Sequence, residues 1–180
     1  MSISPRSRTA AIALFAAAAA IGVAVLSKSW FSAGDEGGIG LTGIEECRRG
    51  VCHSASWGEM NAPGDLTAFG YIGFAGGLIA ALACAAAALL LVTGRAKKLV
   101  ELKATRVLSG ALVVGALGQI AFVNTVMGKG RAPIGWALVV GIGAALGAAV
   151  VVKLLLTPAL REATDGAPAP APAPQPYTIA

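Results

Sequence analysis

Charged residues are scarce in this chain. Only 13% of its 180 residues are Asp, Glu, Lys or Arg, whereas a soluble domain carries roughly a quarter. Hydrophobic residues make up 56%, and the mean hydropathy is +0.75. These residues stand in long unbroken blocks, a pattern that amphipathic helices and alternating strands do not produce. The shortage of charge therefore excludes a soluble globular protein.

Groups that carry out catalysis or move ions are also few. The chain has one histidine, and it contains no Ser/His/Asp set, no paired-carboxylate site and no phosphate-cradling loop. Three of its four hydrophobic blocks lack an ionisable residue in their central turns, and the remaining one, residues 107–127, carries only the uncharged Gln119 and Asn124. Pumps and coupled transporters usually need ionisable groups there. Membrane thiol–disulfide enzymes need two communicating cysteine pairs, and here there is one pair and a lone Cys84. We therefore expect a protein that is not an enzyme.

The four hydrophobic blocks predict the fold. They cover residues 10–26, 69–92, 107–127 and 134–156. A helix needs about 20 apolar residues to cross the hydrocarbon core, and each block falls in the usual range. We expect the first block to be an uncleaved helix rather than a signal peptide, because its apolar run is long and no clean cleavage site follows it. The sequence thus predicts an all-α membrane protein, a bundle of four transmembrane helices.

Basic residues predict the orientation of this bundle. With a cytoplasmic N-terminus, segments 1–9, 93–106 and 157–180 and the inner end of the last block carry nine Lys and Arg. The outer loops, 27–68 and 128–133, then carry five. Because cytoplasmic loops are enriched in Lys and Arg, we expect both termini in the cytoplasm. The usage rich in Ala, Gly and Arg and the simple loops indicate the inner membrane of a prokaryotic cell. The pI near 9.5 then reflects topology and lipid contact, not a nucleic-acid surface.

The first outer loop holds two cysteines and the only histidine, in the stretch GIEECRRGVCHSASW. Outside the cytoplasm, Cys47 and Cys52 can oxidise. Gly50 between them can take the positive φ of a tight turn, and facing residues of a hairpin lie close enough for a disulfide. A structural zinc site would lack a fourth ligand, so we expect no metal. The residues favour a disulfide-stapled β-hairpin or small sheet.

The same stretch leaves a second interpretation open. Cys-x4-Cys-His is similar to a variant of the c-type haem attachment motif, with His53 as proximal ligand and Met60 as a distal candidate. The loop is rich in Gly and Ser and has few large apolar groups with which to bury a porphyrin. We therefore expect no cofactor, with haem c on Cys47, Cys52 and His53 as the alternative.

The arrangement resembles the claudin and peripheral-myelin-protein superfamily. Those proteins have four spans, a large first outer loop and a small second one, with a first-loop signature of Trp, Gly-Leu-Trp and two cysteines. Here Trp30, Gly40, Leu41, Cys47 and Cys52 follow in that order, although a threonine replaces the last signature residue before the cysteines and the cysteines are closer together. The resemblance implies a left-handed four-helix bundle capped by an outer sheet, and a role in lateral or cell–cell assembly.

Small residues indicate how the helices pack. Gly73 and Gly77, and likewise Gly143 and Gly147, form Gly-x-x-x-Gly motifs, which let helix backbones approach closely. We expect these contacts inside the bundle, with self-association of protomers as the alternative. Gln119 is the main polar residue within the blocks, and we expect it to hydrogen-bond a neighbouring helix rather than line a pore.

Together these features predict a non-enzymatic multi-pass membrane protein that assembles with other membrane proteins, or with itself, through outer loop 1. The lipid bilayer is its other partner, and neither a nucleic acid nor a small-molecule substrate is indicated. The alternatives are a membrane electron-transfer subunit with one covalent haem, and a channel or transporter accessory subunit. The Pro/Ala-rich tail, residues 157–180, is expected to be extended and unpacked from Asp165 onward.

Overall fold

The computed structural model describes residues 5–32, 37–129 and 133–165. Four helical segments in these residues are long and apolar enough to cross a membrane. They are α1 (Pro5–Leu26), α2 (Gly64–Val92), α4 (Ala104–Lys129) and a last segment composed of α5 (Trp136–Val151), the π-helical turn η1 (Val152–Leu156) and α6 (Thr157–Asp165). A short helix, α3 (Ala96–Glu101), joins α2 to α4. The predicted four-helix architecture of a multi-pass membrane protein is confirmed.

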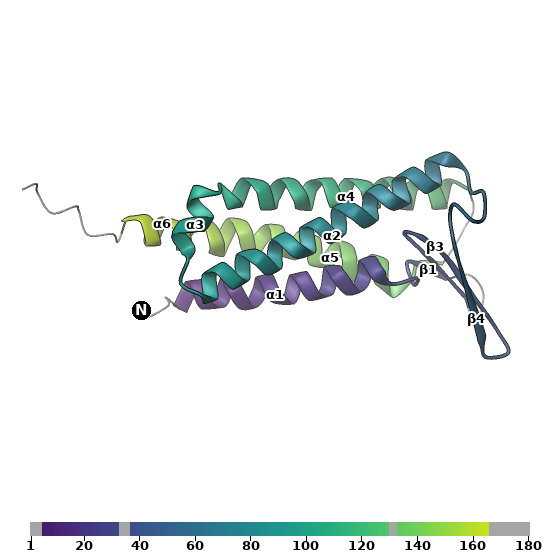
Figure 1. The fold of residues 1–180 in the computed structure, drawn as a ribbon, viewed down its shortest axis with the longest axis horizontal. Coiled ribbons are helices and arrows are strands. Elements are labelled where there is room, and N and C mark those ends of the chain that lie inside the picture. The colour runs from purple at the N-terminus through teal and green to yellow at the C-terminus, as the bar shows by residue number, and fades with distance from the viewer. Residues whose placement is uncertain (1–4, 33–36, 130–132, 166–180) are drawn as a thin grey trace, which may run out of the picture.

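The long helices lie lengthwise beside one another, with a small sheet at one end (Figure 1). We call this end the sheet end. The start of α1, together with α3 and α6, lies at the opposite end, which we call the basic end because it carries residues such as Lys97, Lys103 and Arg106 (Figure 1). Helix α2 packs against both α1 and α4, and α1 also packs against α5. Helix α2 therefore packs between α1 and α4, and α1 packs between α2 and α5.

Helices α1, α2 and α4 begin before their predicted apolar blocks. Helix α2 begins at Gly64, five residues before its block, directly after Pro63 and with Asp65 in its first turn. An acidic side chain there interacts favourably with the positive end of the helix dipole. The helix ends before Gly94, whose φ of 70° is the left-handed conformation that commonly terminates helices. Helix α2 therefore extends beyond its apolar block at the N-terminal end only.

The last span also continues beyond its predicted end. The predicted boundary was residue 156, but the chain stays helical through η1 and α6 to Asp165. The Thr157 hydroxyl donates to the Val152 carbonyl, 2.8 Å away, within the π-helical turn. The predicted tail therefore starts with a helix over residues 157–165, and residues 166–180 lie outside the described part of the chain.

The buried face of α2 is built almost entirely from small residues at spacings of three and four. These are Gly70, Gly73, Gly76, Gly77, Ala80, Ala81, Cys84, Ala87, Ala88 and Leu91. A Cβ added to Gly73 would lie 3.2 Å from the backbone of α4, and one added to Gly77 would lie 2.5 Å from Val25 of α1. Small residues at these sites let α2 approach both neighbours closely, as the first Gly-x-x-x-Gly motif predicts.

The second motif behaves differently. Gly143 and Gly147 are exposed, and a Cβ added to either would meet no atom within 4 Å. The buried face of α5 is instead formed by Ala137, Leu138, Gly141, Ala145 and Ala148. The expected packing of Gly143 and Gly147 inside the bundle is therefore wrong. The physical reason is the rotation of α5, which turns the opposite side of the helix toward α1.

Gln119 is the one buried polar side chain among the described residues, with 1% of its surface exposed. It faces Gly77 on α2, so it lies between two helices as expected. Its Oε1 atom, however, has no hydrogen-bond partner within the residues that the structure describes. The predicted bond to a neighbouring helix is thus not made by this acceptor.

The sheet is an antiparallel meander of four strands in the order β1-β2-β3-β4. The strands are β1 (Phe31–Ser32), β2 (Gly37–Gly40), β3 (Gly43–Arg48) and β4 (Val51–Ser56). Strands β3 and β4 form a hairpin with Arg49 and Gly50 at its turn, both with positive φ (51° and 80°). Positive φ at both central residues is typical of the hairpin turn that follows the natural twist of the strands.

Candidate functional site

Trp30 connects the sheet to the helix bundle. Its side chain is fully buried, and its Nε1 donates to the carbonyl of Ala24 in α1 at 2.7 Å. Its backbone N–H donates to Ile39 of β2 at 3.0 Å, and its carbonyl accepts from the N–H of Gly135 at 2.8 Å. One residue therefore connects α1, β2 and the start of α5, so the sheet is held in a defined position on the helices.

An aromatic cluster lies beneath the sheet. The ring of Phe122 on α4 lies 6.4 Å from Trp30, 6.3 Å from Phe31 and 6.2 Å from Trp57. These centroid distances are those of favourable edge-on and tilted aromatic pairs. The Nε1 of Trp57 donates to the carbonyl of Leu41 at 2.8 Å, which satisfies its buried polar atom. Residues at the beginning of the sheet (Trp30 and Phe31) and just after its last strand (Trp57) thus contact Phe122.

The β1 edge of the sheet is closed by the segment before α5. The N–H of Ser32 donates to the carbonyl of Pro133 at 2.9 Å, and Phe31 forms a β-bridge with Ile134. The two predicted outer loops therefore meet in one structure. A covered edge presents no backbone groups to another strand.

Strand β4 forms the other edge, and its backbone faces outward at alternate residues. Cys47 and Cys52 face each other with Cα atoms 4.0 Å apart, the short separation of a pair that exchanges no backbone hydrogen bonds. Because the pattern alternates, the N–H and C=O groups of Cys52, Ser54 and Ser56 point away from β3. These groups define what we call the β4 edge.

The β4 edge is capped only where it approaches the bundle. The Ser56 N–H donates to Oε2 of Glu59 at 2.7 Å, and the Ser56 carbonyl accepts from Met60 N–H at 3.2 Å. The hydrogen bond from the Ser56 amide lowers the pKa of Glu59 most, and the hydrogen bond from the Ser56 hydroxyl lowers it further. This carboxylate therefore stays ionised at neutral pH. No strand pairs with the β4 edge at Cys52 and Ser54 in the part of the chain that the structure describes.

The hairpin is exposed and carries little protection against strand pairing. Strand β4 has no Lys, Glu, Asp or Pro, the residues with which sheet edges usually prevent association. Its Val51 is 57% exposed at the tip. Beside it, Arg48 forms an ion pair with Glu46, and its Nε donates to Oε1 at 2.7 Å. This pair neutralises charge near the tip, although it adds little stability because both side chains are exposed.

The residues of the alternative haem site do not fit a covalent haem in this structure. The predicted disulfide joins Cys47 to Cys52, so neither sulfur remains for a thioether bond. His53 follows Cys52 in a regular strand, and their side chains therefore point to opposite faces of the sheet. Met60 is half-buried against the hydrophobic core. The stapled hairpin in a small sheet is the interpretation that the structure confirms.

Of the first-loop residues that carried the family resemblance, Trp30, Gly40 and Leu41 lie at the base of the sheet, whereas the two cysteines lie next to the hairpin turn. Trp30 and Leu41 are fully buried, and a Cβ on Gly40 would lie 2.8 Å from the Ser27 carbonyl. Sequence reasoning missed Trp57 and Phe122. The sequence did offer a signal for both residues. Each is a large aromatic residue among small neighbours, and buried aromatic side chains contribute strongly to packing energy.

The comparisons with known proteins assign no family. None of the protein-family models matches the chain, and no curated protein is similar to it in sequence at a significant level.

Removing the disulfide is expected to loosen the hairpin and leave the bundle intact. A Cys47→Ser/Cys52→Ser variant loses about 2 kcal/mol of hairpin stability, because so short a loop removes little chain entropy. The four helices pack without contact from this bond, so helical content by circular dichroism should not change. Mass spectrometry of the non-reduced protein checks the bond directly. Two free thiols would contradict it, and a haem mass on this peptide would support the alternative site.

Proposed function

We propose that this protein is a non-enzymatic membrane protein that joins other membrane proteins through its sheet. The partner contributes an extended segment that pairs with the β4 edge at Cys52 and Ser54. Strand addition to an open sheet edge is a common mode of peptide recognition, in which backbone hydrogen bonds supply affinity. The observation that carries the proposal is the asymmetry of the two edges: residues 133–134 cover β1, whereas no described residue pairs with β4 at Cys52 and Ser54.

Rigidity of the hairpin supports this role. The disulfide and the tight turn at Arg49 and Gly50 hold β4 extended in the absence of a partner. A strand that is already ordered loses less conformational entropy when a second strand pairs with it. The Trp30 and Phe122 contacts then connect the sheet firmly to the helices.

The location of the sheet follows from the predicted topology. If the basic end faces the cytoplasm, the sheet lies outside it, where the disulfide is chemically stable. This is the arrangement that the resemblance to the claudin superfamily implies, and assembly through the first outer loop is the function that it suggests. The partner is then a membrane or surface protein on the outer side, or a second copy of this chain.

A proline at Ser54 tests the proposal. The Ser54 N–H points away from β3, so its loss leaves the hairpin ladder intact but removes a donor from the β4 edge. We expect Ser54→Pro to abolish cross-linked complexes formed in native membranes from a photo-reactive residue placed at Val51. The matched control is Ser54→Ala, which changes the same side chain, keeps the N–H and should keep the complexes.

The outcomes separate the partners. An adduct of twice the chain mass identifies a second copy, and any other mass identifies a different protein. Equal cross-linking by both variants would show that the β4 edge is not the binding surface. The same conclusion would follow if a photo-reactive residue at the exposed Ile79 gave as many adducts as the one at Val51.

A further inference from the structure

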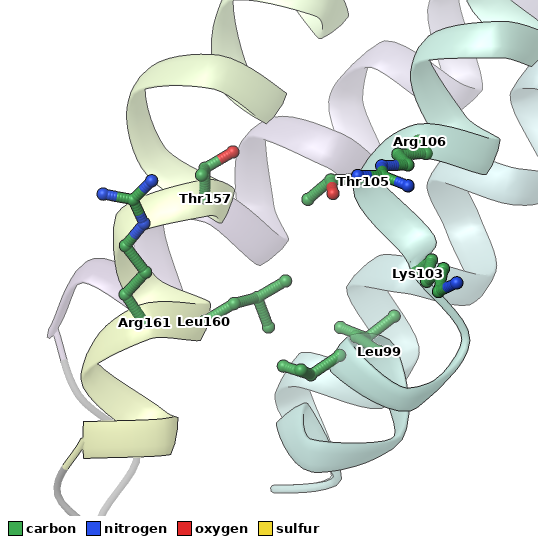
Figure 2. Close-up of a pocket in the computed structure, with 8 residues that line it drawn as sticks. Leu99, Lys103, Thr105, Arg106, Thr157, Leu160 and Arg161 are labelled. Atoms are coloured by element: carbon green, nitrogen blue, oxygen red, sulfur yellow. The ribbon is translucent and has the colours of Figure 1, made fainter.

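A cleft of about 380 Å³ lies at the basic end of the bundle, far from the sheet. Its apolar base is formed by Leu99 and Val100 of α3 and Leu160 of α6. Leu99 and Leu160 are only 2% and 6% exposed and point toward each other across the cleft (Figure 2). The base of the cleft is therefore suited to a group with apolar carbon atoms.

Three cationic side chains surround this base. Lys103, Arg106 and Arg161 line the cleft, and no acidic residue does. All three are exposed, and none forms an ion pair within the residues that the structure describes. Lys103 occupies the corner between α3 and α4 with a φ of 48°, a conformation that lets α4 start directly beside α3. The cleft therefore combines three positive charges, which form no ion pair with a described residue, with an apolar base.

One hydroxyl in the cleft is available as a hydrogen-bond donor. Thr105 of α4 is half-buried, and its hydroxyl makes no hydrogen bond to any described residue. Thr157, on the opposite wall, is different because its hydroxyl proton is already donated to the Val152 carbonyl. A phosphate oxygen can thus accept from Thr105 and from the three cations, whereas Thr157 has no proton left to offer.

The cleft also lies at a defined depth. The third candidate span begins at Ala104, and the fourth ends at Arg161. Thr105, Arg106 and Arg161 therefore stand where the apolar spans end, which is the level of the lipid headgroups. Basic pockets between helices at this level are suited to anionic headgroups.

We propose that this cleft binds the headgroup of an anionic phospholipid. The phosphate lies among Lys103, Arg106 and Arg161 and accepts from Thr105, and the glycerol and upper acyl carbons contact Leu99 and Leu160. Phosphate recognition alone would also suit a soluble phosphate ester. The apolar base and the position at the ends of two spans favour the lipid. The site is independent of the β4 edge.

Binding of phosphatidylglycerol to the purified full chain, measured by native mass spectrometry, tests this proposal. A Lys103→Gln/Arg106→Gln/Arg161→Gln variant should bind it roughly tenfold more weakly or worse, because each cation near the surface contributes to the attraction. The matched control is Arg95→Gln/Lys97→Gln/Lys98→Gln. It removes three charges from the neighbouring segment, outside the cleft lining, and should bind like the unchanged chain. An equal loss of lipid binding in both variants would show that diffuse surface charge, and not the cleft, binds the lipid. That result would overturn the proposal.

Two further measurements separate the ligand sources. Thr105→Val keeps charge and shape but removes the donor, so it should weaken lipid binding without altering the helical content. Inorganic phosphate should not displace the lipid, because it gains nothing from the leucine base. Displacement by inorganic phosphate would assign the cleft to a soluble ligand. Equally tight binding of phosphatidylcholine would show that the charges do not select the headgroup, and either result would overturn the proposal.

Discussion

Replacing Gly76 with leucine is expected to separate α2 from α4 and destabilise the whole bundle. A Cβ at Gly76 would lie 2.7 Å from the Cα of Gly115, a backbone atom that no side-chain rotation can move. A Cβ at Gly118 would meet the backbone N of Gly73 at 2.8 Å, so the two helices touch through glycines at more than one level. The cost is about 3 kcal/mol or more, because the helices themselves must shift.

The matched control for this substitution is Gly147→Leu. Gly147 lies on the exposed face of α5, where a Cβ meets no atom within 4 Å. Leucine there only adds apolar surface toward lipid, and we expect no loss of stability. Unfolding of both variants by sodium dodecyl sulfate, followed by circular dichroism, measures the difference. Similar unfolding midpoints for the two would show that α2 and α4 do not depend on the close glycine contact.

Replacing Phe122 with alanine is expected to detach the sheet from the helices. Phe122 is fully buried and contacts Trp30, Phe31 and Trp57. Truncation of a buried phenylalanine costs about 3–5 kcal/mol, through lost contacts and the cavity that remains. Its three partners are the residue before β1, the first residue of β1 and the residue directly after β4, so the loss should be largest at the sheet end. Trp30 and Trp57 then report the change by a red shift of tryptophan fluorescence.

Phe15→Ala provides the comparison within the same residue type. Phe15 lies on α1 with 43% of its surface exposed, so its truncation leaves no closed cavity. We expect a change within about 0.5 kcal/mol and no shift in fluorescence. Limited proteolysis of the hairpin gives a second measurement: cleavage should accelerate in Phe122→Ala only. Equal behaviour of the two variants would mean that the aromatic cluster does not hold the sheet.

The sequence alone determined the features that depend on residues close to one another along the chain. Four apolar runs predict four spans, because crossing the hydrocarbon core depends on the length and hydropathy of each segment by itself. The hairpin was equally predictable, since Cys47, Gly50 and Cys52 lie within six residues and a tight turn brings them together without help from the rest of the chain. The oxidising environment expected outside the cytoplasm supports the same prediction.

Tertiary structure decided which surfaces these elements use. Gly73 and Gly77 carry the same motif as Gly143 and Gly147, yet the first pair is buried and the second is exposed. Motif spacing places two residues on one side of a helix, but only the rotation of that helix in the bundle decides whether the side meets a neighbour. With apolar residues all around each span, lipid and protein faces look alike in the sequence.

The same reason explains the two candidate sites. Residues 133–134 cover β1, a contact between segments about a hundred residues apart, whereas no described strand pairs with the β4 edge at Cys52 and Ser54. The basic cleft exists because the corner at Lys103 and the helical continuation past Thr157 bring α3, α4 and α6 to the same end. Such contacts depend on how whole helices are placed in three dimensions, and local sequence patterns carry no information about that placement.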